Sequence, residues 1–257
     1  MILHAEHAID QGIPRIIVAS SDTDVMILLL HFIAPIAEET WMAAKKEKKM
    51  YPLHEIVKGI PPIVLSNLPG FHALTGCDTT SSFRKFGKKT CWATYLQHAE
   101  LLTHVGRDED SKQAEMFVLY IYKNPNSNNL NAARYEIFTK GKKEVEKLPP
   151  TQDAFQLHLV RANHQANIWY QATTPLMEIE NPADTLGWSK TGVNQLEIIW
   201  TRLTPVSQST FEIFTCGCTT QCGTSRCTCA KSGLVCIPAC GCDARNCFNP
   251  NSLPMPQ

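Results

Sequence analysis

The stretch CGCTTQCGTSRCTCAKSGLVCIPACGCDARNC, residues 216–247, contains nine of the eleven cysteines in this 257-residue chain. Three Cys-x-Cys pairs alternate with single cysteines, and few apolar side chains lie between them. So short a segment with so few apolar residues cannot fold by burial alone, and cross-links or bound metal must hold it together. The nine cysteines are Cys216, Cys218, Cys222, Cys227, Cys229, Cys236, Cys240, Cys242 and Cys247.

The odd number of cysteines argues against disulfide bonds, because one thiol would be left over. Residues 1–6 lack the basic segment of a secretory signal, so we expect an intracellular chain, and clustered cysteines in a reducing compartment usually bind zinc. Three tetrahedral zinc ions need twelve bonds, which nine thiolates supply if three of them each bridge two ions. Separate four-cysteine sites would use eight thiolates and leave one over. The count therefore predicts a three-zinc cluster.

The cysteine spacing, with the closing Cys247-Phe248-Asn249, resembles the tesmin-type CXC domain. Related nine-cysteine clusters occur in pre-SET regions and in single-CXC chromatin proteins. The resemblance implies a CXC zinc domain at residues 211–250, with Arg226 and Lys231 as candidate DNA contacts. Tesmin-type members carry two such repeats and bind DNA, whereas this chain has one. Where those members tend to have lysines and a tyrosine, this chain has Thr219, Thr220 and Arg226.

The net charge of the predicted zinc domain bears on its partner. Arg226, Lys231 and Arg245 exceed the single Asp243 by two positive charges, while nine thiolates with three Zn²⁺ ions leave three negative charges. The folded domain is then close to neutral and lacks the strongly basic surface that phosphate binding favours. DNA and a chromatin or other protein therefore both stay open as partners.

Polar residues follow the first apolar run of the chain. Arg15–Ser20 is short, apolar and β-branched, which predicts a buried parallel strand. Asp22 and Asp24 come directly after it, and Val25–Leu30 resumes the core as a helix or a second buried segment. Ligand sites of open α/β sheets lie at the carboxyl ends of strands, so this pair of aspartates is a candidate metal site.

Helical periodicity, with proline and glycine at the boundaries, predicts most of the remaining elements. The predicted helices are Ile2–Gln11, Leu53–Ile60, Ser66–Gly76, Thr90–Glu100, Ser111–Tyr122, Arg134–Thr139 and Gln152–Gln171, the last capped by Thr151. Segments 45–49, 124–131 and 175–192 are predicted to be irregular, and Leu196–Trp200 to be a strand or a turn.

The helix predicted at Ser66–Gly76 leads into Gly76-Cys77-Asp78. Asp22, Asp24 and Asp78 together can supply the oxygen ligands with which Mg²⁺ or Mn²⁺ catalyses phosphodiester hydrolysis. Aspartates in such places also serve as turn or cap residues. The two interpretations predict different geometry, because catalysis requires the three carboxylates to converge.

Residues 16–25 and 74–78 resemble the second half of the flap-endonuclease/PIN-like nuclease domain, in which a strand ends in Asp-x-Asp and a later helix ends in Gly-Cys-Asp. The resemblance implies an α/β fold, with a parallel sheet and flanking helices, and metal ligands at the three aspartates. It also implies DNA-backbone contacts from the basic turn Phe83–Lys89. The residues concerned are Lys85, Gly87, Lys88 and Lys89.

The wider arrangement is similar to a group of uncharacterised, often transposon-associated animal proteins that join a PIN-like domain to a CXC domain. We expect a partial PIN-like domain at 1–105, a helical extension at 106–172, a linker at 173–210 and the zinc domain at 211–250. Family members carry further acidic ligands before this region. The resemblance therefore implies an amino-terminally incomplete or degenerate nuclease domain that is inactive in this form.

Three functions follow as alternatives. The first is a zinc-binding, nucleic-acid-associated protein with a degenerate nuclease domain. The second is a nuclease that, when complete, is structure-specific and depends on Mg or Mn, and the third is a chromatin- or protein-binding module or an inactive transposon-derived fragment. A net charge of zero argues against a wholly basic nucleic-acid coat and a membrane-surface protein. The longest apolar run, Val25–Leu30, is too short to span a membrane. A nuclear location follows from the resemblance, and the oligomeric state is left unspecified.

Overall fold

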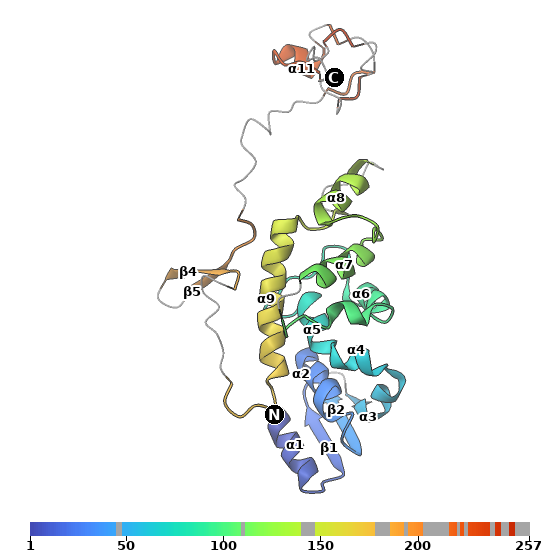
Figure 1. The fold of residues 1–257 in the computed structure, drawn as a ribbon, viewed down its shortest axis with the longest axis vertical. Coiled ribbons are helices and arrows are strands. Elements are labelled where there is room, and N and C mark those ends of the chain that lie inside the picture. The colour runs from blue at the N-terminus through green and yellow to red at the C-terminus, as the bar shows by residue number, and fades with distance from the viewer. Residues whose placement is uncertain are drawn as a thin grey trace. The chain divides into compact units, whose positions relative to one another are not determined.

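The computed structural model describes residues 1–44, 48–108, 111–139, 147–177, 186–192, 195–202, 216–219, 222–223, 226–236, 240–242 and 247–249. The chain folds as two compact units, Met1–Arg202 and Leu203–Gln257. The first unit mixes helices with two small sheets (Figure 1), and the second contains the cysteine cluster. None of the helices described is long and apolar enough to cross a membrane.

A three-stranded sheet lies at one end of the first unit (Figure 1). Its strands are β1 (Arg15–Ala19), β2 (Glu39–Ala44) and β3 (Lys49–Pro52), in the order β1-β2-β3. β1 and β2 run parallel and β2 and β3 antiparallel, so the sheet is mixed rather than wholly parallel. β1 confirms the strand predicted at Arg15–Ser20. Lys49, which was predicted to lie in an irregular segment, instead begins β3.

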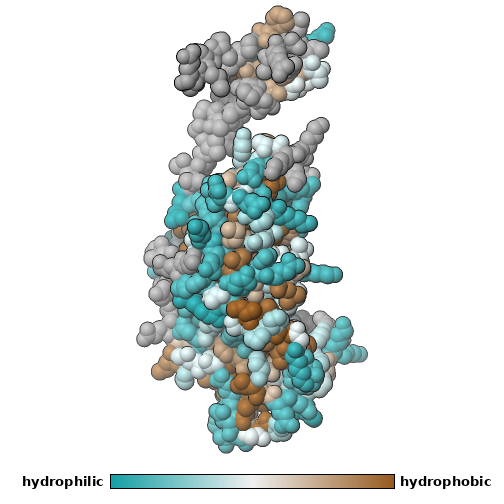
Figure 2. Space-filling view, turned by 45° about the vertical axis from the view of Figure 1, so that its right-hand side comes forward, coloured by the Kyte–Doolittle hydropathy of each residue, from teal (hydrophilic) through white to brown (hydrophobic). Residues whose placement is uncertain are grey.

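β1 pairs in parallel as predicted, but the prediction that it is buried was wrong for most of its residues. Ile16 is buried, whereas its neighbour Ile17, whose side chain points to the opposite face of the sheet, is 57% exposed. β2 was not predicted, since its buried face includes the polar Thr40 and its half-exposed face includes the apolar Trp41, so the hydropathy of the sequence does not alternate with burial. Figure 2 shows apolar surface among polar side chains at this lower end of the first unit.

Short helices connect the sheet to the candidate site. α1 (Ile2–Asp10) precedes β1, and α2 (Thr23–Leu28) follows it and continues as the π-helical turn η1 (Leu29–Ile33). The predicted helix Leu53–Ile60 consists of α3 (Leu53–Ile56) and the 3₁₀ turn η2 (Val57–Gly59). α4 (Pro62–Ser66) precedes α5 (Leu68–Leu74), every residue of which is buried. α5 thus begins two residues later and ends two residues earlier than the helix predicted at Ser66–Gly76.

The long helix α9 (Gln152–Tyr170) confirms its prediction, and the Thr151 hydroxyl accepts a hydrogen bond of 3.3 Å from the Ala154 amide at its N-terminus. α9 lies along α5 (Figure 1). The core between the helices is apolar and aromatic, with Phe117 and Phe155 fully buried. The other helices are α6 (Lys88–Tyr95), η3 (Ala99–Leu102), α7 (Ser111–Ile121) and α8 (Leu130–Thr139).

An antiparallel pair of strands, β4 (Trp188–Gly192) and β5 (Gln195–Ile198), follows α9. β4 lies in a segment predicted to be irregular, whereas β5 agrees with the strand alternative for Leu196–Trp200. Most residues of both strands are exposed, so no apolar pattern marks β4. The buried Arg161 donates hydrogen bonds to the carbonyls of Gly187 (3.1 Å) and Ile199 (3.0 Å) and so joins this pair to α9.

Candidate metal centre and acidic pocket

The core of the second unit consists of cysteine side chains. Cys218, Cys242 and Ala230 are half-buried around seven buried cysteines. Sulfur therefore takes the place that apolar side chains occupy in an ordinary domain. The seven buried residues are Cys216, Cys222, Cys227, Cys229, Cys236, Cys240 and Cys247.

The sulfur atoms have the spacing of a tetrahedral metal site. The Sγ of Cys216 lies 3.7 Å from that of Cys222 and 3.8 Å from that of Cys236, and the Cys229 and Cys240 sulfurs are 3.7 Å apart. A disulfide bond would bring two sulfurs to about 2 Å. Thiolates bound to one zinc ion at about 2.3 Å in a tetrahedron lie about 3.8 Å from each other. The cluster can therefore hold a metal such as zinc, as the sequence predicted.

Local structure positions these thiols. The short helix α11 (Thr228–Lys231) begins after Cys227 and contains Cys229. The chain then turns at Gly233, whose φ of +69° favours glycine. Cys236 next donates its backbone N–H to the carbonyl of Asn249 at 2.7 Å. This hydrogen bond joins the last described segment to the segment that follows α11.

Asn249 also contacts the sulfur atoms directly. Its backbone N–H donates to the Cys247 sulfur at 3.4 Å, and its side-chain amide lies 3.5 Å from the Cys236 sulfur. The same amide donates to the Leu234 carbonyl at 2.8 Å. Hydrogen bonds to ligand sulfurs orient them and offset thiolate charge, so Asn249 supports the cluster from outside.

There are three groups of four cysteines in which the four sulfur atoms all lie within 4.8 Å of one another. Cys216 belongs to all three groups, and Cys222 and Cys236 to two each. The groups are Cys216–Cys218–Cys222–Cys227, Cys216–Cys229–Cys236–Cys240 and Cys216–Cys222–Cys236–Cys242. The two candidate DNA contacts, Arg226 and Lys231, are exposed on or next to α11.

A separate pocket of about 340 Å³ lies in the first unit, between α2, α5, α6 and the loop after α5. Asp24 and Asp78 both line it, so the structure brings two of the three predicted carboxylates to one cavity. Its lining is Thr23, Asp24, His72, Gly76, Cys77, Asp78, Thr80, Ser82 and Lys88.

Asp22 has a different place. It is the N-cap of α2, and its Oδ1 accepts a hydrogen bond of 2.9 Å from the backbone N–H of Asp24. This is the cap role that the sequence offered as an alternative. Among the described residues, groups of cysteines bring their ligand atoms to within 4.8 Å of one another, but the three aspartates do not.

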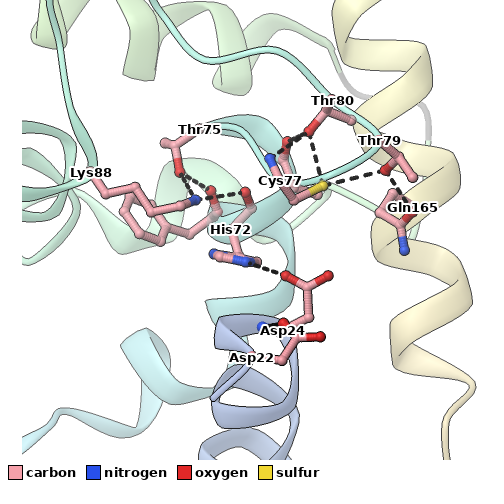
Figure 3. A network of polar contacts seen from close by, with 11 residues as sticks. Asp22, Asp24, His72, Thr75, Cys77, Thr79, Thr80, Lys88 and Gln165 are labelled. Carbon is pink, nitrogen blue, oxygen red and sulfur yellow. Dashed lines mark hydrogen bonds and ion pairs between the residues drawn. The ribbon is translucent and has the colours of Figure 1, made fainter. Parts of the chain in front are cut away.

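His72 holds Asp24 in the pocket (Figure 3). Its Nε2 lies 2.8 Å from Asp24 Oδ1, and its side chain is 3% exposed. Burial lowers the pKa of His72, and the nearby charge of Lys88 lowers it further, against the opposing effect of Asp24. A neutral imidazole donating to the carboxylate fits this environment. His72 was not predicted as a site residue, although a histidine inside the apolar helix α5 is a signal that the sequence contains.

Lys88 also lines the pocket, and its side chain reaches the C-terminal end of α5 (Figure 3). Its ammonium donates to the His72 carbonyl and the Thr75 hydroxyl, each at 3.1 Å. Burial lowers the pKa of Lys88 to about 8. The sequence predicted that Lys88 contacts phosphate from a surface turn, whereas in the structure its side chain lines the pocket with Asp24 and Asp78. Of the other predicted contacts on the turn, Lys85 and Lys89 are exposed, and Gly87 is the N-cap of α6.

The loop that carries Asp78 is held in a fixed turn. Gly76 has a φ of +108°, and a Cβ there would lie 2.9 Å from the Ser82 Cβ, so the turn requires glycine. Cys77 donates its N–H to the Thr80 hydroxyl at 3.2 Å. The Thr79 hydroxyl donates to Gln165 on α9 at 2.7 Å, which ties the loop to the long helix (Figure 3).

No protein-family model, curated protein or solved structure matches this chain. The function is therefore argued from the two sites themselves.

Proposed function

We propose that this chain is a zinc-binding, nucleic-acid-associated protein in which the cysteine unit holds three zinc ions and serves as a targeting module. The observation that carries the proposal is the set of sulfur–sulfur distances of 3.7–3.8 Å in a core made of cysteine. Thiolates packed this closely without metal would repel one another, whereas bound zinc would stabilise the fold.

The shared cysteines support a definite arrangement. Cys216 and Cys222, with Cys218 and Cys227, would hold the first ion. Cys216 and Cys236, with Cys229 and Cys240, would hold the second. Cys222 and Cys236 remain to bridge a third ion with Cys242 and Cys247, and the Cys247 thiol contacts those three thiols. This arrangement uses all nine thiolates and gives each ion four sulfur ligands.

The test is native mass spectrometry of the full chain, with and without replacement of a bridging ligand. We expect three zinc ions in the unmodified chain. Cys216→Ala removes a ligand of two ions and should leave at most one bound ion. Cys218→Ala removes a ligand of one ion and should leave two or three. Two ions in the unmodified chain, with one thiol that reacts freely with a thiol reagent, would contradict the three-zinc cluster.

The targeting role rests on Arg226 and Lys231, which present positive charge beside the cluster on an exposed surface. DNA is the first candidate partner and a chromatin protein the second, with the nucleus as the expected location. Changing both residues to Gln should weaken DNA binding and reduce its salt dependence by about two units of slope. Unchanged DNA binding, with zinc content intact, would argue for the protein partner.

A second candidate function is metal-dependent phosphodiester hydrolysis at the acidic pocket. The observation in its favour is that Asp24 and Asp78 share a cavity with His72 and Lys88, just beyond the carboxyl end of β1. Two carboxylates bind Mg²⁺ or Mn²⁺ weakly, because affinity follows ligand number and charge. We therefore expect this pocket to be degenerate. Cleavage of single-stranded or flap DNA in Mn²⁺ that Asp24→Asn abolishes would instead establish an active nuclease.

A further inference from the structure

The lysine that lines the acidic pocket has the surroundings of a nucleophilic amine (Figure 3). Lys88 is half-buried at the start of α6, and its Nζ donates to the His72 carbonyl and the Thr75 hydroxyl. The Thr75 hydroxyl donates its own hydrogen to the Phe71 carbonyl at 2.7 Å, so it accepts from Lys88. Both partners of the amine are therefore hydrogen-bond acceptors, held in place by α5 and its C-cap residue.

This arrangement leaves the lone pair of the neutral amine available. A neutral lysine amine has two N–H bonds, and the two fixed acceptors match them, so the lone pair lies on the side of the nitrogen that these acceptors do not occupy. Because burial lowers the pKa of Lys88 to about 8, about one tenth of its amines are neutral at pH 7. This fraction is roughly 300 times that of a lysine whose pKa is 10.5. Desolvated lysines of this kind attack carbonyl carbons.

Burial sets the charge state of Lys88 against its neighbours. It outweighs the negative charge of Asp24, which favours the charged amine. His72, which faces the lysine from α5, is itself neutral because burial lowers its pKa. The titratable groups around Lys88 are Asp24 on α2, His72 on α5, Cys77 and Asp78 on the loop after α5, and Cys91 on α6.

The second candidate nucleophile of the pocket, Cys77, is held as a thiol. Its Sγ lies 3.3 Å from the Thr79 hydroxyl and 3.1 Å from that of Thr80. These hydroxyls donate their hydrogens elsewhere, to Gln165 and to the Ala73 carbonyl, so toward Cys77 they accept from its S–H. A protonated thiol is a poor nucleophile, because the thiolate is the reactive form. The lysine is thus the stronger nucleophile of the two.

The remaining lining of the pocket defines the class of carbonyl compound that it can take. Thr23, Asp78 and Ser82 are exposed where they line the pocket, so a ligand can enter from solvent. Together with Asp24 and Thr80, they present carboxylate and hydroxyl groups, which hydrogen-bond the hydroxyls of a ligand. The two carboxylates outnumber the single lysine of the lining, so the pocket repels an anionic ligand. Its volume of about 340 Å³ suits a small molecule.

We propose that Lys88 forms a Schiff base with a small, uncharged hydroxyaldehyde bound in the acidic pocket. The amine nitrogen attacks the carbonyl carbon, and one amine proton passes to the carbonyl oxygen to give a carbinolamine. The new hydroxyl group takes the second amine proton and leaves as water, while the nitrogen lone pair forms the C=N bond. Asp24 and Asp78 lie in the same pocket and can carry these protons. The reaction needs no metal, so it is independent of the zinc cluster and of phosphodiester hydrolysis.

The test traps the Schiff base with sodium cyanoborohydride, which reduces the C=N bond to a stable secondary amine. The full, zinc-loaded chain is incubated at pH 7 with glyceraldehyde and the reductant, and peptide mass spectrometry locates the adducts. We expect Lys88 to be labelled about 100-fold faster than Lys89, the exposed neighbour on the same helix, because its larger neutral fraction outweighs the lower basicity of its amine. Lys88→Arg keeps the charge and should abolish this label, while labelling at Lys89 stays unchanged.

Equal labelling of Lys88 and Lys89 in the unmodified chain would overturn the proposal, and this comparison needs no variant to fold. Glyceraldehyde 3-phosphate tests the class of ligand. Relative to Lys89 in the same sample, it should label Lys88 about tenfold more slowly than glyceraldehyde does, because the carboxylates repel its phosphate. Equal or faster labelling by the phosphorylated aldehyde would contradict an uncharged ligand. Labelling of Lys88 in a chain that does not cleave DNA in Mn²⁺ supports this site alone, whereas cleavage without labelling overturns it.

Discussion

Lys88→Met tests the unusual position of a lysine in the wall of the acidic pocket. The pKa of Lys88 falls from its ordinary 10.5 to about 8 because burial disfavours the charged form. At about 1.4 kcal/mol per pH unit, keeping this ammonium charged at pH 7 costs the folded state up to about 3 kcal/mol. Methionine removes that cost and keeps most of the volume. It also removes two hydrogen bonds, to the His72 carbonyl and the Thr75 hydroxyl, worth about 1 kcal/mol each.

The pH dependence gives the prediction its sign. Below pH 8 both the folded and the unfolded state bind the Lys88 proton, so the cost is constant. As pH rises from about 8 toward 10.5, the folded state has released the proton and the unfolded state has not, so the stability of the unmodified chain increases. Lys88→Met lacks this gain. The variant should be about 1 kcal/mol more stable at pH 7 and about 1 kcal/mol less stable near pH 10.

Urea unfolding followed by tryptophan fluorescence measures this difference, because all five tryptophans lie within Met1–Arg202. Lys89→Met is the matched control, since Lys89 is the exposed neighbour on the same helix and should change stability by no more than about 0.5 kcal/mol at either pH. A stability difference for Lys88→Met that keeps one sign and size from pH 7 to pH 10 would show that the folded state does not lower the pKa of Lys88.

Three smaller predictions follow from single contacts. Asn249→Ala removes the amide that lies against the Cys236 sulfur, and transfer of zinc to a chelator should become about 10- to 100-fold faster; an unchanged rate would count against this role. Gly76→Ala, strained at φ +108° and 2.9 Å from Ser82, should lose about 2–4 kcal/mol in urea unfolding, whereas Gly59→Ala, with open space around it, should not. Thr151→Ala should lose about 1 kcal/mol, and Thr151→Ser much less.

The parts of the fold that the sequence predicted depend on local signals. The start of α9 is set by prolines and a capping Thr151, and α1 ends where Gly12 takes a positive φ. β2 and β3 carry no such signal, because the hydropathy of β2 does not follow its burial, with Thr40 buried and Trp41 half-exposed, and the pairing with β3 is a contact between strands. The mixed sheet therefore emerges only in three dimensions.

The cysteine cluster and the acidic pocket likewise differ in how far the local sequence predicts them. The cysteine cluster lies within 32 residues, so spacing alone indicates a metal site, and the structure brings these thiols together. The acidic pocket depends on how α2, α5 and α6 pack. Asp22 and Asp24 are two residues apart, yet one caps a helix and the other lies in the pocket. The inward turn of Lys88 and its contact with the His72 carbonyl likewise follow from tertiary structure.

The most direct test of the three-zinc cluster is X-ray absorption at the zinc edge of the purified chain. The cluster predicts four sulfur ligands per ion at about 2.3 Å, together with a zinc–zinc distance shorter than about 4.6 Å, because two such bonds meet at each bridging sulfur. Three zinc ions per chain should accompany this spectrum. Sulfur ligands without a zinc–zinc vector, at two ions per chain, would contradict the shared roles of Cys216, Cys222 and Cys236.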